Sequence, residues 1–283
     1  MGTQEPPNRK RKADPQEKAY ADHGANLELN GANVNCNMRI VSLVPSWSEF
    51  VVDLGLGNQL VGRTKFCTRT PGFEHTSLVV GGTKSFHVER VAQMKPDLII
   101  ACKEENTRDQ VEACSAFSEV YLTDVRSVEQ AIATMRDLSK ALNAGHIGRD
   151  WCARIVEAWG QRREPIVQAA YVIWADPVMV AGADTYIHDV LSWWGIENVC
   201  KDVDATRYPA LTPEFMQNST CECALLSSEP FPFQASDKPR FQTWASHVEL
   251  VDGEAFSWYG SRMLHAVPYF KSLHQQLRQL RPA

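Results

Sequence analysis

The sequence RIVSLVPSWSEFVVDLGL, residues 39–56, decides the fold class of this chain. Its first six residues, 39–44, are mostly apolar and predict a buried strand. A short loop follows, and residues 50–56 then show the apolar spacing of a helix. Ser46 and Glu49 have the spacing of a capping box, which predicts that the helix begins at Ser46. The stretch is therefore a strand–loop–helix unit of an α/β domain.

The same alternation of strands and helices continues along the rest of the chain. We expect further strands at residues 59–62, 79–84, 98–102, 119–122, 170–174, 222–227 and 248–251. We expect further helices at residues 87–94, 107–116, 127–142, 184–194 and 261–280. The strand at 98–102, LIIAC, is apolar on both faces, which is typical of a central strand in a parallel sheet.

Residues 147–168 separate two such α/β halves and carry apolar residues at helical spacing, with no loop signal before Pro165. A helix of up to about 18 residues would span some 27 Å, at about 1.5 Å per residue. We therefore expect two α/β lobes with mostly parallel sheets, 38–145 and 169–283, joined by one long helix at 146–168. In open α/β sheets ligands bind at the carboxyl ends of the strands, so we expect the ligand site at these ends.

The composition of the chain argues against a nucleic-acid-binding, a membrane-spanning or a disulfide-rich protein. The chain has 283 residues, 44% of them hydrophobic, and a net charge of −5, which argues against a nucleic-acid-binding surface. No apolar run approaches the ~20 residues of a membrane helix. Residues 1–37 are polar and lack the apolar segment of a secretory signal, so we expect a disordered tail. The eight scattered cysteines predict no disulfide framework, and the close pair Cys221 and Cys223 lacks a second pair to complete a metal site.

Five stretches, in this order along the chain, resemble the helical-backbone (class III) periplasmic binding proteins of ABC importers. They are closest to the cobalamin-binding branch of that family, and the resemblance covers about residues 38–280. The stretches are RIVSLVPSWSE (39–49), VGGTKSFHVERVAQMKPDLIIACKEEN (80–106), AGADTYIHDVLSWWGIENV (181–199), ALLSSEPFPF (224–233) and DGEAFSWYGSR (252–262). The ordered set is specific, whereas a single motif such as KPDLII is not.

The resemblance implies a non-catalytic protein that binds a cobalamin-like tetrapyrrole or a chelated metal, with no catalytic cofactor. In this branch a flat corrin lies between the lobes against aromatic side chains, each of which can bury about 150–250 Å². The matching positions here are Ser46, Trp47, Phe66, Phe86, Trp174, Asp176, Arg207, Tyr208, Phe231, Trp258, Tyr259 and Arg262. The polar members would hold the propionamide or phosphate edges of the ligand. We expect Trp151, Trp159, Trp193, Trp194 and His188 to be structural.

The resemblance also implies a partner and a location. Family members dock on an ABC permease through an exposed glutamate on each lobe, and here Glu104, Glu105 and Glu229 are the candidates. We expect a monomer. Because no signal segment is evident in the sequence as written, we expect a cytoplasmic location, or a periplasmic one if the N-terminus has been altered.

Two other functions stay open at this level. The first is a cytoplasmic enzyme that uses Glu104, Glu105, Glu229 and Glu254, with Lys84 or Lys103, as acid and base. The sequence shows no nucleophile elbow, phosphate loop or metal-ligand pair to support it. The second is a pure interaction protein with a vestigial cleft.

Overall fold

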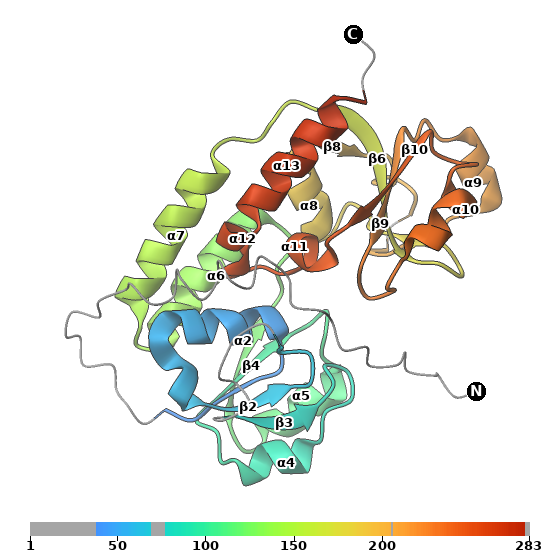
Figure 1. Ribbon diagram of the computed structural model, residues 1–283. Coiled ribbons are helices and arrows are strands. Elements are labelled where there is room, and N and C mark those ends of the chain that lie inside the picture. Colours follow the sequence, from blue (N-terminus) through green and yellow to red (C-terminus); the bar gives the residue numbers. More distant parts are fainter. Residues whose placement is uncertain (1–37, 69–76, 205, 281–283) are drawn as a thin grey trace. The chain divides into compact units, whose positions relative to one another are not determined.

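Two five-stranded sheets organise the chain, one in each half of the sequence (Figure 1). The computed structural model describes residues 38–68, 77–204 and 206–280, and these belong to one compact unit. We call residues 38–142 the first lobe and residues 167–280 the second lobe, and the predicted α/β fold class is confirmed. None of the helices formed by the described residues combines the length and apolar character needed to span a bilayer.

The first sheet is entirely parallel, with the strand order β3-β2-β1-β4-β5. Its strands are β1 (Ile40–Ser42), β2 (Leu60–Thr64), β3 (Leu78–Gly81), β4 (Leu98–Cys102) and β5 (Glu119–Thr123). Every residue of β1 and β4 is buried. This burial explains why both strands are apolar on their two faces, as central parallel strands must be.

The second sheet is mixed, with the order β10-β9-β6-β7 and β8 paired with β6. Its strands are β6 (Val167–Trp174), β7 (Met179–Val180), β8 (Ile196–Asn198), β9 (Cys223–Ser227) and β10 (His247–Val251). Only β7 runs antiparallel to its neighbour. The short strands β7 and β8 were not predicted from the sequence, because two or three residues are too few to show the alternation of apolar and polar residues in a strand.

Six predicted helices are confirmed, four of them within a residue or two of their expected ends. They are α2 (Pro45–Val51), α4 (Val88–Gln93), α5 (Arg108–Ser115), α6 (Val128–Ala141), α8 (Tyr186–Trp193) and α13 (Val267–Arg278). A π-helical turn, Val52–Leu56, and a 3-10 turn, Gly57–Gln59, extend α2. Short helices that were not predicted are α9 (Pro213–Asn218), α10 (Lys238–Phe241) and α11 (Gly253–Ser257), with a 3-10 turn at Ala235–Asp237. The helix predicted at 261–280 is divided into α12 (Arg262–His265) and α13.

Helix α2 does not begin with a capping box. Its N-cap is Val44, no side chain caps it, and Pro45 occupies the first helical position. Proline is favoured there because its fixed φ suits a helix and its missing N–H would have no partner. Ser46 and Glu49 are instead buried inside the helix, so the predicted capping box is wrong.

The connecting helix is shorter than predicted. Helix α7 covers Gly145–Trp159, 15 residues, and lies beside α6 (Figure 1). It ends at Gly160, whose φ of +65° is a left-handed conformation that favours glycine. The chain between Gly160 and β6 is not helical, so the extension of the predicted helix to residue 168 is wrong.

An aromatic cluster anchors α7 to the second lobe. The ring of Trp159 lies 5.8 Å from that of Trp194 and 5.9 Å from that of Phe270, centroid to centroid. Its indole N–H donates to the carbonyl oxygen of Met263 at 2.8 Å. Trp151, Trp159 and Trp194 are buried, as predicted for core residues. Trp193 is only half-buried and lies under the guanidinium of Arg162.

Candidate ligand-binding site

The carboxyl ends of the parallel strands carry many of the residues predicted for the ligand or the partner. Glu104 and Glu105 follow β4 in the first lobe, Glu229 and Phe231 follow β9 in the second lobe, and Trp174 is the last residue of β6. Parallel strands gather their carboxyl ends at one edge of a sheet, where α/β proteins bind their ligands. The strand ends are therefore the place to look for a site in each lobe.

Three of the predicted aromatic side chains remain accessible. Phe66 is 49% exposed and Trp174 is 40% exposed. Phe231 is half-buried, and its ring lies 5.5 Å from that of Trp174. Phe66 follows β2, whereas Trp174 and Phe231 belong to the strand ends of the second sheet. Each lobe thus offers an aromatic surface at the carboxyl ends of its strands.

Three other predicted ligand residues of the first lobe, Ser46, Trp47 and Phe86, are core residues. Trp47 is 0% exposed, because α2 begins at Pro45 and Trp47 lies inside the helix instead of an open loop. Its indole N–H donates to Thr123 Oγ1 at 3.1 Å. Ser46 and Phe86 are also buried. The expectation that these three side chains line an open cleft is corrected.

Tyr259 is buried against both Trp47 and the end of β4. Its ring centroid lies 4.7 Å from that of Trp47, and its hydroxyl donates to Cys102 Sγ at 3.3 Å. Tyr259 belongs to the second lobe, whereas both of its partners belong to the first. The side chain therefore joins the lobes instead of presenting a free aromatic face.

Trp258 is likewise less accessible than the sequence indicated. Residues 253–257 form helix α11, and Trp258 is its C-cap with 9% of its surface exposed. The indole N–H donates to Glu229 Oε1 at 3.0 Å. The guanidinium of Arg262 lies 5.6 Å from the indole ring centre. These neighbours cover the ring, so the predicted open loop is corrected.

Arg262 is engaged by a buried carboxylate. Its guanidinium lies 2.8 Å from Glu49 Oε1, and its Nε donates to Glu49 Oε2 at 3.1 Å. A charge held in this way is not available for a ligand edge, which corrects the expectation for Arg262. Asp176, by contrast, is exposed, and its backbone carbonyl accepts a hydrogen bond from the Trp174 indole at 3.1 Å.

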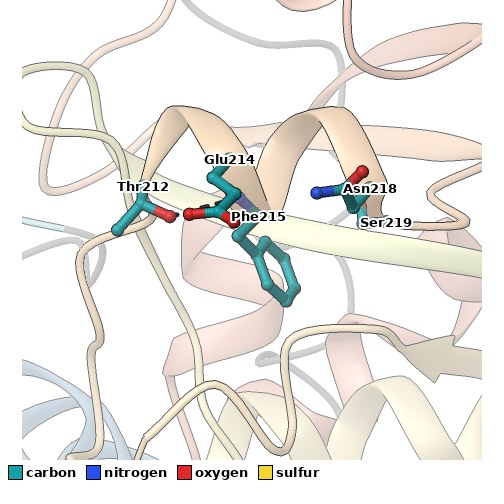
Figure 2. Close-up of a pocket in the computed structure, with 5 residues that line it drawn as sticks. All are labelled: Thr212, Glu214, Phe215, Asn218 and Ser219. Carbon is teal, nitrogen blue, oxygen red and sulfur yellow. Dashed lines mark hydrogen bonds between the residues drawn. The ribbon is translucent and has the colours of Figure 1, made fainter.

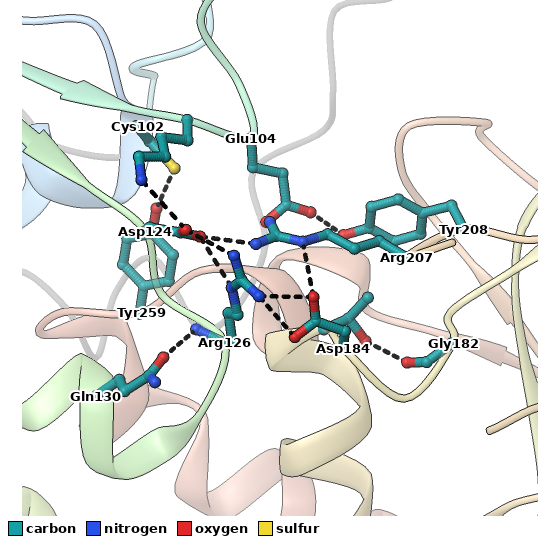
Figure 3. Close-up of polar contacts among 12 residues, drawn as sticks. Cys102, Glu104, Asp124, Arg126, Gln130, Gly182, Asp184, Arg207, Tyr208 and Tyr259 are labelled. Atoms are coloured by element: carbon teal, nitrogen blue, oxygen red, sulfur yellow. Dashed lines mark hydrogen bonds and ion pairs between the residues drawn. The ribbon is translucent and has the colours of Figure 1, made fainter. Parts of the chain in front are cut away.

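Arg207 and Tyr208 reach from the second lobe to the first (Figure 3). Arg207 Nη2 lies 2.7 Å from Asp124 Oδ1, and Arg207 Nη1 lies 3.5 Å from Glu104 Oε2. The Tyr208 hydroxyl donates to Glu104 Oε1. Burial and the neighbouring Glu104 raise the pKa of Tyr208 above its usual range, so the hydroxyl keeps its proton as a donor.

A second arginine bridges the lobes in the opposite direction. Arg126, in the first lobe, lies 2.8 Å from Asp184 Oδ2 in the second lobe and 2.8 Å from Asp124 Oδ2 in its own. The hydrogen bond from Arg126, with that from Arg207, holds the pKa of Asp124 well below its usual range. Asp124, Arg126 and Asp184 were not predicted as site residues, because no local spacing connects them.

The glutamates predicted to dock a permease are not exposed. Glu104, Glu105 and Glu229 are all half-buried. Burial, followed by the charges of Glu229 and Glu104, raises the pKa of Glu105 to about 8. Burial and the charge of Glu254 raise the pKa of Glu229 to about 7. The expectation of two exposed docking carboxylates, one per lobe, is therefore corrected.

Asn106 explains why the turn after β4 keeps these glutamates half-buried. Its side-chain oxygen accepts from Cys102 N at 2.8 Å, and its amide nitrogen donates to the carbonyl oxygens of Thr83 at 2.9 Å and Leu43 at 3.3 Å. These bonds hold the four polar residues 103–106 against the end of the sheet. A sequence in which polar residues follow a strand does not distinguish this turn from an open loop.

Two hollows lie beside α9 in the second lobe. The first has a volume of about 280 Å³ and is lined by Thr212, Glu214, Phe215, Asn218 and Ser219 (Figure 2). The second has a volume of about 220 Å³ and is lined by Val178, Pro213, Met216, Gln217, Arg240, Phe241, Thr243 and Trp244. Both are smaller than the roughly 300–1,000 Å³ typical of small-molecule sites. None of the predicted ligand residues lines either hollow.

Metal-ligating groups are scattered in the described part of the chain. Within residues 38–68, 77–204 and 206–280, no three or more His, Cys, Asp and Glu side chains gather as a metal site would require. Seven cysteines in these ranges are free and buried, among them Cys221 and Cys223.

Comparison with known proteins identifies the family. A family model described as "Periplasmic binding protein" matches residues 40–240, well over half of the chain. The chain belongs to the periplasmic binding protein family. Proteins of this family bind ligands without transforming them, so this chain is a binding protein and the enzyme alternative is not supported.

Relatives of this family member include vitamin B12-binding proteins. The one from Pectobacterium carotovorum is 22% identical over 253 residues, which cover 86% of this chain and 90% of the relative. The cobalamin-binding protein of Halobacterium salinarum is 27% identical over 186 residues, which cover 62% of this chain and 50% of the relative.

Solved structures show the same periplasmic binding protein fold. The periplasmic haem-binding protein BhuT, in complex with two haems, has a TM-score of 0.73 at 20% identity, covering 86% of this chain and 99% of its own. The periplasmic vitamin B12-binding protein BtuF of Vibrio cholerae has a TM-score of 0.69 at 18% identity, covering 85% and 98%.

The family also bears on the expected location. It is a family of periplasmic proteins, so the expectation of a cytoplasmic location finds no support. That expectation rested on residues 1–37, which lie outside the described part of the chain.

Proposed function

We propose that this chain binds a flat tetrapyrrole, a cobalamin-like corrin ahead of haem, at the carboxyl ends of its two sheets. The observation that carries the proposal is the match to a vitamin B12-binding protein along 86% of this chain. The haem-bound structural neighbour makes haem the second candidate.

The accessible aromatic side chains give the proposal a physical basis. Phe66 in the first lobe, with Trp174 and Phe231 in the second, offers flat apolar faces at the strand ends. A macrocycle gains most from such faces, because each aromatic ring removes a large apolar area from water and fixes the orientation of the ligand plane. We assign the main ligand contacts to these three residues, with the exposed Asp176 at the polar edge.

The permease partner and the monomeric state are part of the proposal. Substrate-binding proteins of ABC importers deliver a ligand to a permease, and the family membership supports that role here. Because Glu104 accepts a hydrogen bond from Tyr208 and burial raises the pKa of Glu105, we place the docking surface elsewhere on the lobes.

Titration of purified protein with cyanocobalamin and, separately, with haemin tests the proposed function. We expect quenching of tryptophan fluorescence at micromolar concentrations or below, because Trp174 is exposed at the proposed site. A Trp174→Phe variant should bind with similar affinity but show less quenching, which identifies the reporter. Absence of both quenching and calorimetric heat with either macrocycle would reject the proposal.

A further inference from the structure

Arg63 is a charged residue in the interior of the first lobe. It lies within β2 and is only 9% exposed. A guanidinium loses its hydration when it is buried, so it is tolerated in the interior only where hydrogen-bond acceptors replace the water. The positions of those acceptors therefore show what the burial of Arg63 achieves.

The acceptors of Arg63 lie at both ends of the connection between β2 and β3. Arg63 Nη1 donates to the carbonyl oxygen of Cys67 at 3.1 Å and to that of Thr64 at 3.4 Å. Arg63 Nε donates to Ser77 Oγ at 3.1 Å. Cys67 lies near the start of the connection, and Ser77 directly precedes β3. One guanidinium thus holds both ends of this connection.

Phe66 lies in the first part of the same connection, directly before Cys67. Its backbone N–H donates to Thr64 Oγ1 at 3.3 Å. Its ring lies beside Gly82, where a Cβ atom would be 3.6 Å from Phe66 Cε2. The side chain nevertheless stays 49% exposed. An accessible aromatic ring is therefore carried by a backbone that Arg63 holds at the next residue.

The side chain of Cys67 holds the same point of the backbone. Cys67 Sγ lies 3.0 Å from Ser48 Oγ of α2 and 3.3 Å from Thr64 Oγ1. Cys67 is 2% exposed, so these contacts are buried. The residue after Phe66 is consequently tied to α2 through its side chain and to Arg63 through its carbonyl oxygen.

We propose that Arg63 is a positioning residue that holds Phe66 ready for the macrocycle without touching the ligand itself. The inference rests on the proposed function, because Phe66 is one of the three aromatic residues assigned to the ligand. A ring on a loose connection would have to be ordered when the ligand binds, and this ordering would weaken binding. A ring on a connection that is already held avoids that loss.

The shape of the guanidinium suits this role. Nε and Nη1 belong to one rigid plane and donate in different directions, so a single side chain bonds to Ser77 and Cys67 at once. A lysine would keep the positive charge but would lose the fixed fork. Arg63→Lys therefore tests the fork separately from the charge.

A double-mutant cycle tests whether Arg63 acts through Phe66. Calorimetry measures the affinity for cyanocobalamin of wild type, Arg63→Lys, Phe66→Ala and the double variant. We expect Arg63→Lys to weaken binding about fivefold in the wild-type background, the scale of ordering one side chain. In the Phe66→Ala background it should have almost no effect, because the ring that it positions is absent. An equal loss in both backgrounds, or no loss in either, would overturn the proposal.

Two controls separate positioning from a general effect on the protein. Arg39→Lys is the same substitution in the same lobe, at an arginine whose Nε donates to the carbonyl oxygen of Met94 at 2.8 Å. Arg39 precedes β1, at the amino end of the sheet, so this variant should keep wild-type affinity. Combining Arg63→Lys with Trp174→Ala should multiply the two losses, because Trp174 belongs to the second lobe. A comparable loss in Arg39→Lys would count against the positioning role.

Fluorine NMR of protein labelled with 4-fluorophenylalanine tests the same role without a ligand. The Phe66 line is assigned by its disappearance in Phe66→Leu. In Arg63→Lys we expect this line to sharpen and to shift toward that of the free amino acid. The line of Phe270, which is 0% exposed, should stay unchanged. A Phe66 line that the substitution leaves unchanged would overturn the proposal.

Ser77→Ala guards against an Arg63 variant that folds poorly. It removes the acceptor of Arg63 Nε and leaves Arg63 itself in place. We expect a smaller change of the Phe66 line in the same direction, and an unchanged line would count against the proposal. If wild type binds neither cyanocobalamin nor haemin, the proposed function fails, and the fluorine line still decides whether Arg63 positions Phe66.

Discussion

The guanidinium of Arg262 in α12 lies 2.8 Å from the carboxylate of Glu49 in α2, and the contact joins the second lobe to the first. The Glu49 side chain is 1% exposed and the Arg262 side chain 15% exposed, so the pair is nearly removed from water. Asp53 lies close by, and burial together with the charge of Glu49 raises the pKa of Asp53 to about 7. Arg262 therefore balances an acidic region inside the protein.

Arg262→Ala should lower the free energy of unfolding by about 3 kcal/mol, because it leaves the Glu49 carboxylate buried without its arginine. Urea unfolding followed by circular dichroism measures the loss. Arg108→Ala, at an exposed pair whose side chains are 88% and 60% exposed, is the control and should leave the free energy of unfolding nearly unchanged. Equal effects of the two substitutions would contradict the assignment of Arg262.

Trp47→Ala should destabilise the fold by about 3–5 kcal/mol, the usual cost of deleting a fully buried tryptophan side chain. The indole is 0% exposed and also loses its hydrogen bond to Thr123. Thermal unfolding gives the measurement. Trp47 in an open cleft would instead leave the melting temperature nearly unchanged while weakening ligand binding.

Trp174→Ala should weaken macrocycle binding by about 1–3 kcal/mol, the contribution of one aromatic face and its buried area. Its effect on the free energy of unfolding should stay within about 0.5 kcal/mol, because the side chain is 40% exposed. Isothermal calorimetry with cyanocobalamin and urea unfolding separate the two quantities. A variant that keeps wild-type affinity would remove Trp174 from the site.

Stability should fall as the pH rises, because Glu105 and Glu229 hold their protons in the folded protein. The pKa of Glu105 is raised from 4.5 to about 8 and that of Glu229 from 4.5 to about 7. In the unfolded chain both carboxyls ionise near their ordinary pKa. The contribution of the two protonated carboxyls to the free energy of unfolding is therefore fully present below about pH 4.5. It is lost progressively as the pH rises to about 8.

Glu105→Gln should reduce this pH dependence and raise the free energy of unfolding at pH 8.5 by about 2 kcal/mol. The gain should vanish at pH 4, where the wild-type carboxyl is protonated in both states. Urea unfolding at a series of pH values measures the difference. A constant difference across that series would show that Glu105 ionises normally.

The fold was predictable because its central strands have a local signature. The run LIIAC at 98–102 is apolar on both faces and became β4 with the predicted bounds. Helix α6 followed from the apolar spacing of 127–142, and Ser127 caps it by accepting from Gln130 N. Three residues that mark helix ends were misinterpreted. They are Pro45 at the first position of α2, Gly160 at the end of α7 and Asp252 at the N-cap of α11.

The arrangement of the site was less predictable, because it depends on contacts distant in sequence. Glu104 and Tyr208 are 104 positions apart, and no local pattern shows that the Tyr208 hydroxyl donates to the Glu104 carboxylate. From sequence alone, a glutamate at the end of a strand is therefore predicted to be exposed, because its partner is not known. The accessible Phe66 and Trp174 were found because a strand-end aromatic needs no distant partner to be identified.

Because Tyr259 covers Cys102, the rate at which the Cys102 thiol reacts reports on the contact between the two lobes. The Cys102 thiol is buried in the first lobe, and the hydroxyl that covers it comes from the second. The other described cysteines are buried as well, within residues 38–68, 77–204 and 206–280. An alkylating reagent that modifies Cys102 before those thiols would therefore record how often the two lobes part, in a protein whose overall fold stays intact.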